Sequence, residues 1–365
     1  MGDSEQQLLT RADITAIVRQ SYRQSARHDG DDNQLWATAW SKWQSTNARF
    51  YLGRQSAESL EWDMHNLWYL FYEASINISE EHPAADRLAM QVITAREQGL
   101  LIRDVDPGKG TDDESLTQAT TADGNVWTDL PFLVSDMTKY WLEEHAGLSS
   151  AQRLRFSNFL AKLAAAGVGR DDGLCRIALA TFRQALETPR HSLGTSADQQ
   201  QAEDASRLEA QLTIAAYLPS VNSWLNWASL KIIQLSETGK SWIPAAGSSE
   251  HEEELGGLFQ HDVVVDTDDG LAATPTLATT GTASLGFSVS RWIFWLTRLE
   301  SLAESFRDSG EDALAGLATG MMDNMLIVAD ATGGKLKKNL EAAYQSGKVQ
   351  HGPANKEPPS RLPRE

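Results

Sequence analysis

Apolar residues recur at intervals of three and four along most of this sequence, a pattern that favours helices over strands. The stretch 58–77 is typical, because Leu60, Met64, Trp68 and Phe71 fall on one helical face. The same spacing predicts helices over 84–101, 130–146, 150–168, 173–187, 196–218, 288–306 and 312–332. Strand-like alternation is confined to 262–267. The pattern predicts a single all-α domain of roughly ten helices.

Two segments depart from this helical pattern. Residues 244–286 are rich in Gly, Ser, Thr and acidic residues, and so long a connection is expected to be a lid, another functional loop or a disordered segment. The polar, Pro-rich stretch 347–365 is expected to be a disordered tail. We therefore expect the folded domain to cover residues 1–346.

The charge of the chain excludes several classes of partner. The formal net charge is -18, which opposes binding to nucleic acid or to an anionic membrane surface. No run of about 18 apolar residues is present, so no membrane span is expected. Cys175 is the only cysteine, and the first residues lack the features of a signal peptide. These features favour a cytoplasmic protein.

A stripe of polar side chains marks residues 221–231, VNSWLNWASLK, which follow Pro219 and are expected to form the first turns of a helix. Asn222, Asn226 and Ser229 are spaced i, i+4 and i+7, so they share one helical face. Asparagine is a middling helix former, so the repetition calls for a reason. One reason is hydrogen bonding to a neighbouring helix, and another is binding of a metal through neutral oxygens.

A second pair of oxygen donors lies in EASIN, residues 73–77. Glu73 and Asn77 are spaced i and i+4, and an aromatic stretch precedes them. A carboxylate and an amide oxygen on one face can share a hard cation such as Mg²⁺. The alternative is that Glu73 is a solvated helix residue and Asn77 marks a helix end.

Two arginines lie in otherwise apolar surroundings. Arg176 interrupts GLCRIALA, and Arg291 precedes Trp292 in GFSVSRWIFW. A buried guanidinium needs an anionic partner, because an unpaired buried charge is costly. For Arg176, that partner is either a carboxylate of this chain or a bound anionic ligand. For Arg291, the alternative is a surface position beside core aromatics.

These elements, in this order, resemble a degenerate class I terpene cyclase. Glu73 and Asn77 stand at the first and last positions of a D-D-x-x-D motif. Asn222 and Asn226 stand at the Asn and Ser positions of an N-D-x-x-S-x-x-x-E motif. The final Glu of that motif is replaced by Leu230, with Lys231 beside it, and only one acid remains in the first motif.

The spacing of the arginines extends the resemblance. Arg176 lies 46 residues before Asn222, where these cyclases carry a diphosphate-sensing arginine. Arg291 and Trp292 stand where an Arg-Tyr pair is expected.

Most of residues 35–305 also resemble a fungal family of helical proteins linked to secondary metabolism. The stretches that carry this resemblance are HPAADRLAMQVITAREQGLL, VWTDLPFLVSDMTKYW, FSNFLAKLAAAGV and GFSVSRWIFWLTRL. Within that background the chain is similar to the divergent fungal α-humulene synthases of tropolone–sesquiterpene pathways.

The resemblance implies a catalytic domain with a central cavity, in which Mg²⁺ binds farnesyl diphosphate. The implied metal ligands are oxygen donors from two helices, namely Glu73, Asn77, Asn222, Asn226 and Ser229. The implied cations around the leaving diphosphate are Arg176, Lys231 and Arg291. The implied cavity residues are large apolar side chains, namely Trp224, Trp227, Leu285, Trp292 and Phe294. A homodimer is left open.

Two other classes of function are compatible with the same residues. A non-catalytic interaction or regulatory protein would pack the stripe of amides against another helix and have no cavity. A metal-free enzyme of secondary metabolism, such as a pericyclase, would have an aromatic pocket without converging basic residues.

Overall fold

The computed structural model describes residues 10–28, 31–53, 56–104, 116–193, 202–242 and 286–347. These ranges contain eleven α-helices and four strands of two or three residues, which confirms the predicted all-α class. The chain divides into two compact units, and each is described by itself. The N-terminal unit comprises Met1–Ile177 and Asp198–Glu209, and the C-terminal unit comprises Ala178–Ala197 and Ala210–Glu365.

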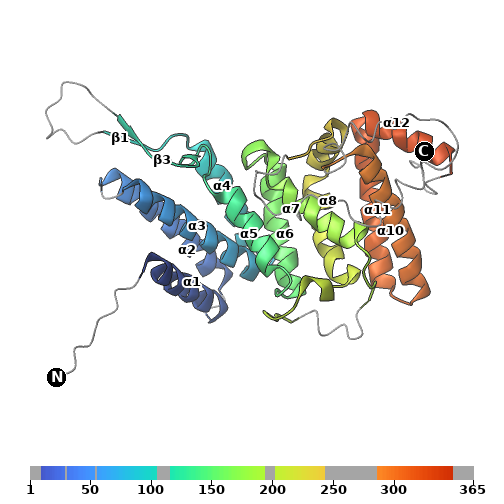
Figure 1. Cartoon of the computed structure of the whole chain (residues 1–365), viewed down its shortest axis with the longest axis horizontal. Coiled ribbons are helices and arrows are strands. Elements are labelled where there is room, and N and C mark those ends of the chain that lie inside the picture. Colours follow the sequence, from blue (N-terminus) through green and yellow to red (C-terminus); the bar gives the residue numbers. More distant parts are fainter. Residues whose placement is uncertain are drawn as a thin grey trace, which may run out of the picture. The chain divides into compact units, whose positions relative to one another are not determined.

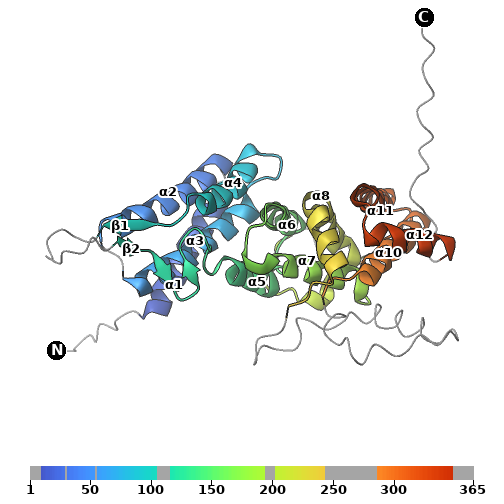
Figure 2. The ribbon, with the colours of Figure 1, turned by 90° about the horizontal axis from the view of Figure 1, so that it is seen from above.

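The N-terminal unit is built around one central helix, α3 (Ala57–Asn77). Its partners are the five helices α1 (Arg11–His28), α2 (Asp32–Tyr51), α4 (Pro83–Glu97), α5 (Leu133–Glu144) and α6 (Ser150–Ala165). The helices α1, α2 and α3 lie side by side in both ribbon views (Figures 1 and 2). Nearly every residue of α3 from Asn66 to Ile76 is buried, because neighbours cover it on several sides.

Two short antiparallel hairpins connect α4 to α5 in this unit. Strand β1 (Ile102–Asp104) pairs with β2 (Leu116–Gln118), and β3 (Thr120–Thr121) pairs with β4 (Gly124–Asn125). The sequence analysis predicted no strand here, because two or three residues are too few to show alternation.

The start of α5 differs from the predicted one. The pattern predicts a helix from 130, but α5 begins at Leu133. Leu130 and Phe132 adopt left-handed backbone angles, with φ of 49° and 64°, so this stretch cannot be α-helical. The carbonyl oxygen of Pro131 instead accepts a hydrogen bond from the indole nitrogen of Trp68 at 2.7 Å.

Four helices and one π-helical turn make up most of the C-terminal unit. After α7 (Cys175–Phe182), in which the first unit ends, come the π-helical turn Arg183–Glu187 and the helices α8 (Ile214–Thr238), α10 (Val289–Asp308), α11 (Asp312–Thr332) and α12 (Lys335–Gln345). The helices α10 and α11 form a tight pair that packs against α8 (Figure 1).

The predicted helix over 196–218 is wrong in its described part. Residues 202–213 form turns and one short 3₁₀ turn, and α8 begins only at Ile214. The backbone N–H groups of Ile214 and Ala215 donate to the carbonyls of His191 and Ser192, so tertiary contacts fix where the helix starts. Residues 194–201 lie outside the described residues.

The expected helix start after Pro219 is also wrong. Pro219 lies inside the second turn of α8, where it costs one internal hydrogen bond. The predicted lid over 244–286 lies, except for Gly286, outside the described residues, as do the strand predicted over 262–267 and the tail from residue 348.

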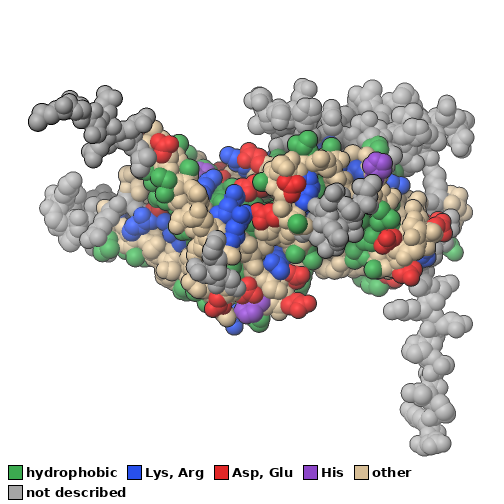
Figure 3. All heavy atoms as spheres, turned by 90° about the horizontal axis from the view of Figure 1, so that it is seen from below, with side chains coloured by type: hydrophobic (Ala, Val, Ile, Leu, Met, Phe, Trp, Pro, Cys, Tyr) green, Lys and Arg blue, Asp and Glu red, His purple; other side chains and the backbone are tan. Residues whose placement is uncertain are grey.

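The surface of the described residues carries mixed charge. On the face shown in Figure 3, basic and acidic side chains are interspersed. Among the helices of the described ranges, none combines the length and the apolar character that crossing a bilayer requires.

Candidate functional site

A cluster of ionisable side chains connects α1, α3 and α5 in the N-terminal unit. We call Arg23, Tyr69, Tyr72, Glu73 and Glu144 the Glu73 cluster. The carboxylate of Glu73 is almost fully buried, and its Oε1 accepts hydrogen bonds from the Tyr69 hydroxyl at 2.6 Å and from Arg23 Nε at 2.9 Å. The carboxylate of Glu144 accepts from Arg23 at 2.7 Å and from the Tyr72 hydroxyl at 3.1 Å. One guanidinium therefore bridges two carboxylates.

Burial and charge shift the proton affinities in this cluster. Burial raises the pKa of Glu144, although the charge of Arg23 opposes the shift. Burial also raises the pKa of Tyr69 and Tyr72, and the neighbouring carboxylates add to the effect. For Arg23, burial alone would lower the pKa, but the hydrogen bond and charge of Glu73 raise it above its ordinary value. The tyrosines and Arg23 therefore stay protonated, whereas Glu144 titrates nearer to neutral pH than an exposed glutamate does.

A second arginine of α1 lies beside tyrosine rings of α3 and α5. The guanidinium of Arg19 lies over the ring of Tyr69, 4.8 Å from its centre, and 5.9 Å from the centre of the Tyr140 ring. The Tyr140 hydroxyl is buried without a hydrogen-bond partner among the described residues. At another point of contact between α3 and α5, Nδ1 of His65 lies 2.8 Å from a carboxylate oxygen of Asp136. The interface between α3 and α5 therefore contains ionisable side chains that lie beside aromatic rings.

The two predicted donors of the first motif make different contacts. Asn77 donates from its side-chain nitrogen to the backbone carbonyl of Glu73 at 2.8 Å, as a residue near a helix end often does. Its own carbonyl accepts from Arg155 at 3.4 Å. The Glu73 carboxylate pairs instead with α1. Glu73 and Asn77 therefore each bond to other groups of the protein, and not to a common partner.

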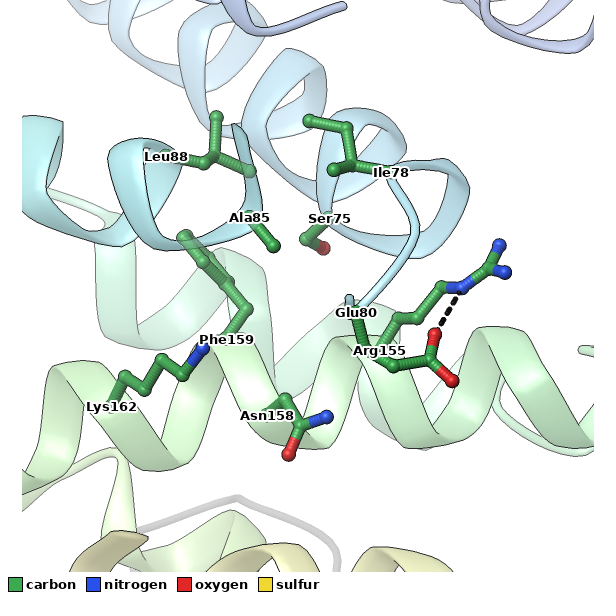
Figure 4. Close-up of a pocket in the computed structure, with 9 residues that line it drawn as sticks. All are labelled: Ser75, Ile78, Glu80, Ala85, Leu88, Arg155, Asn158, Phe159 and Lys162. Atoms are coloured by element: carbon green, nitrogen blue, oxygen red, sulfur yellow. Dashed lines mark hydrogen bonds and ion pairs between the residues drawn. The ribbon is translucent and has the colours of Figure 1, made fainter. Parts of the chain in front are cut away.

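Beyond Asn77 a hollow of about 310 Å³ opens between α3, α4 and α6. Its apolar walls include Ile78, Leu88 and Phe159, which face one another in Figure 4. Arg155 lies at one side, where its Nε donates to Glu80 at 2.8 Å. Lys162 lines the other side and pairs with an exposed aspartate, Asp86. Both cations of this hollow are therefore already neutralised by carboxylates of the chain.

The predicted amide stripe lies on α8 in the C-terminal unit, but its three members differ in exposure. Asn222 is half-buried, Asn226 is exposed and Ser229 is buried. A backbone distortion at Ala228, with φ of -118° and ψ of 16°, interrupts the regular helix between Asn226 and Ser229. The side-chain oxygen of Asn226 accepts a hydrogen bond at 3.2 Å from Asn324 on α11. One member of the stripe therefore bonds to a neighbouring helix.

Arg291 forms a fully buried ion pair in the same unit. Its Nε lies 2.7 Å from Oε1 of Glu187, and neither side chain is exposed. The indole nitrogen of Trp295 donates to the same carboxylate at 2.7 Å, and a second nitrogen of Arg291 donates to the carbonyl of Gly286. Burial lowers the pKa of Arg291, which the charge of Glu187 partly offsets. The surface position given as the alternative for Arg291 is wrong, because the side chain is fully buried and pairs with a carboxylate of this chain.

The remaining predicted residues spread over both units. Arg176, Lys231 and Phe294 are half-buried. Trp224 and Trp292 are fully buried in the core, whereas half of the Trp227 surface is exposed. Leu285 lies outside the described residues. Their roles around a diphosphate or a carbocation stay predictions.

Neither unit alone offers the donor set of a magnesium site. Among the described residues, no group of three or more His, Cys, Asp and Glu side chains is arranged to hold a metal ion. The N-terminal unit supplies one carboxylate, Glu73, which already bears a guanidinium. The C-terminal unit supplies the neutral oxygens of Asn222, Asn226 and Ser229, and Mg²⁺ is usually held by at least one carboxylate. Magnesium binding stays a prediction, and no chemical step is derived from it here.

The sequence analysis missed most of the Glu73 cluster. A signal was present for α5, because Asp136, Tyr140 and Glu144 are spaced i, i+4 and i+8 and so share one face. No such signal marks Arg23, which is 50 residues from Glu73 in the sequence. Long-range ion pairs of this kind follow from the packing of α1 on α3.

Comparisons with known proteins identify the family of this chain. The model of a family described as a protein of unknown function, DUF3632, matches residues 68–299. This chain belongs to the DUF3632 family. It is also 32% identical over 311 residues to the oxopyrrolidines biosynthesis cluster protein G of Penicillium oxalicum, covering 84% of this chain and 78% of that protein. No solved structure matches significantly.

Proposed function

We propose that this DUF3632 protein is an enzyme of fungal secondary metabolism that ionises farnesyl diphosphate and cyclises the cation to α-humulene. The observation that carries the proposal is the 32% identity, over most of the chain, to a protein named for a biosynthesis cluster. Stretches on α4, α5, α6 and α10 carry the resemblance to the fungal helical family, and the likeness to divergent humulene synthases within that background suggests the reaction. The all-α architecture is compatible with both.

The proposed reaction makes two demands on the chain. The bond between the allylic carbon and the diphosphate oxygen breaks, and the leaving group keeps the electron pair. The electron pair of a distal double bond then attacks the resulting cation and closes the ring, and loss of a proton gives the hydrocarbon. Positive charge must therefore surround the diphosphate, and water must be kept from the cation.

The described residues suit these demands unequally. Lys231 and Arg176 are half-buried and are the better candidates to approach a diphosphate. Arg291 is held by Glu187, so we assign it a positioning role at the start of α10. Trp227 is exposed on the helix that carries Asn226, and its ring could stabilise a cation by about 0.5–2 kcal/mol.

The test is incubation of the purified full-length protein with farnesyl diphosphate, with and without Mg²⁺, followed by gas chromatography and mass spectrometry. We expect α-humulene as the main product, and a need for Mg²⁺ would support the predicted metal dependence. Asn226→Leu is expected to abolish turnover. Asn339→Leu, an equivalent change at an exposed site on α12, is expected to keep it. The absence of any hydrocarbon in both conditions would show that the proposal is wrong.

A second candidate function is that of a non-catalytic helical interaction protein. One observation favours it, namely that the side chain of Asn226 bonds to Asn324 of α11, as expected for an amide stripe that packs against another helix. Under this alternative Asn226→Leu removes one hydrogen bond and lowers the free energy of unfolding by about 0.5–1.5 kcal/mol. The wild-type protein would form no product from farnesyl diphosphate. The product assay described above separates the two candidates.

A further inference from the structure

A narrow hollow lies between α1, α2 and α3 of the N-terminal unit. Leu35, Leu70 and Ala74 form apolar parts of its wall, and Tyr22 and Gln34 are among the polar parts. A wider depression of about 730 Å³ shares Tyr22, Gln34 and Leu70 and continues along the surface of α2. The hollow thus adjoins a shallower depression along α2.

The buried carboxylate of Glu73 lines this hollow, and one of its oxygens has no partner among the described residues. Glu73 lines the hollow and is only 1% exposed. Its Oε1 accepts both hydrogen bonds of the side chain, whereas its Oε2 is buried and accepts none from the described residues. An unsatisfied buried acceptor destabilises the protein, and the effect is larger when the acceptor is charged. A donor that enters the hollow would remove this cost.

The charges around the hollow select the kind of donor. Asp31, which caps α2, also lines the hollow, so two of the lining side chains are acidic. The nearby cations are engaged elsewhere, because Lys42 pairs with Asp63 at 3.1 Å and Arg23 bridges Glu73 and Glu144. The hollow has no basic lining residue of its own. A cationic donor is therefore favoured over a neutral one, and an anion is disfavoured.

We propose that this hollow is a binding site for a primary ammonium group carried on a short alkyl chain. The ammonium group donates to Oε2 of Glu73, and Asp31 adds attraction. The alkyl chain lies against Leu35 and Leu70 and extends toward the wider depression. The site shares Glu73 with the predicted Mg²⁺ ligands, but its test is a binding measurement that does not depend on turnover. It needs only the packing of α1 and α2 on α3, which the structure shows.

The test uses n-butylammonium chloride as the probe and sodium butyrate as a control of the same length and opposite charge. Binding to the full-length protein is measured at neutral pH by ligand-detected NMR and by calorimetry. We expect saturable binding of butylammonium and none of butyrate. A hollow that holds only ordered water would bind neither probe, and that result would overturn the proposal.

Three variants locate the binding. Thr38→Trp places a large ring at the exposed rim of the hollow and leaves Glu73 and Arg23 unchanged, and it should weaken butylammonium binding at least about tenfold, or 1.4 kcal/mol. Gln20→Trp, at an exposed position of α1 that does not line the hollow, should leave binding unchanged. Glu73→Gln, if it folds, should reduce binding as well. Equal affinity in the wild-type protein and the Thr38→Trp variant would show that the site is elsewhere.

Discussion

At the scale of single residues, Glu73 shows what a motif can and cannot tell. The sequence predicts a helical carboxylate beside Asn77, and the structure has both on α3. The carboxylate nevertheless interacts with Tyr69 and with Arg23 from another helix, and Asn77 bonds to the backbone of its own helix. Spacing within a helix fixes which side chains share a face, but it does not fix what lies opposite that face.

Glu144 carries the pH dependence of this cluster. Burial raises its pKa in the folded state, so the folded protein holds this proton at pH values where the unfolded chain has lost it. Ionisation therefore disfavours folding. The stabilising effect of the proton, present at low pH, is lost as the pH rises from the ordinary value near 4.5 through the raised pKa.

We therefore expect the Glu144→Gln variant to gain stability relative to the wild-type protein as the pH rises through that window. One proton limits the slope of the difference to about 1.4 kcal/mol per pH unit. Urea unfolding at a series of pH values measures it. Glu143→Gln removes the same charge from the exposed face of α5 and should follow the wild-type curve in parallel. Parallel curves for Glu144→Gln as well would contradict the assignment.

At the scale of elements, helices with a strong apolar face could be predicted, and connections could not. The helix predicted over 58–77 is found at Ala57–Asn77, and that over 312–332 at Asp312–Thr332. The prediction over 196–218 fails because contacts with residues 191 and 192, rather than local propensity, decide where α8 begins. The same holds for the candidate site, where Glu73 could be predicted and its partner Arg23 could not.

The start of α10 depends on one buried ion pair. Arg291 joins Glu187 of the π-helical turn to the carbonyl of Gly286, with neither charged side chain exposed. Removing one partner leaves the other charge buried, so Arg291→Met should cost about 3–5 kcal/mol of unfolding free energy. Arg307→Met, at an exposed position of α10, should change stability by no more than about 0.5 kcal/mol.

The double variant Arg291→Met/Glu187→Leu separates the charge from the packing. It removes both charges together and should recover much of the loss, although the Trp295 indole then lacks its acceptor. Chemical denaturation of all three variants provides the measurement. If the double variant is as unstable as Arg291→Met alone, packing rather than an uncompensated charge is responsible.

At the scale of the whole molecule, two electrostatic effects act in opposite directions. The chain carries a formal net charge of -18, and mutual repulsion of that charge destabilises any compact state. Exposed and half-exposed ion pairs such as Arg155–Glu80 and Lys162–Asp86 act the other way, but each is worth only about 0–1 kcal/mol. Salt weakens both effects, so the sign of its influence on stability shows which is larger.

We expect repulsion to be the larger effect. Raising NaCl from about 0.01 M to 0.15 M shortens the screening length from about 30 Å to about 8 Å. Repulsion acts among many charges across the surface and is therefore screened more than an ion pair in contact, so the melting temperature should rise. Each kcal/mol gained corresponds to about 2–4 °C for a domain of 150–250 residues. Differential scanning calorimetry at both salt concentrations measures the shift, and KCl at equal ionic strength should reproduce it. A fall in melting temperature would mean that the ion pairs stabilise the protein by more than the net charge destabilises it. The ion pairs of Arg23 in the Glu73 cluster would then be the first candidates for this stabilisation.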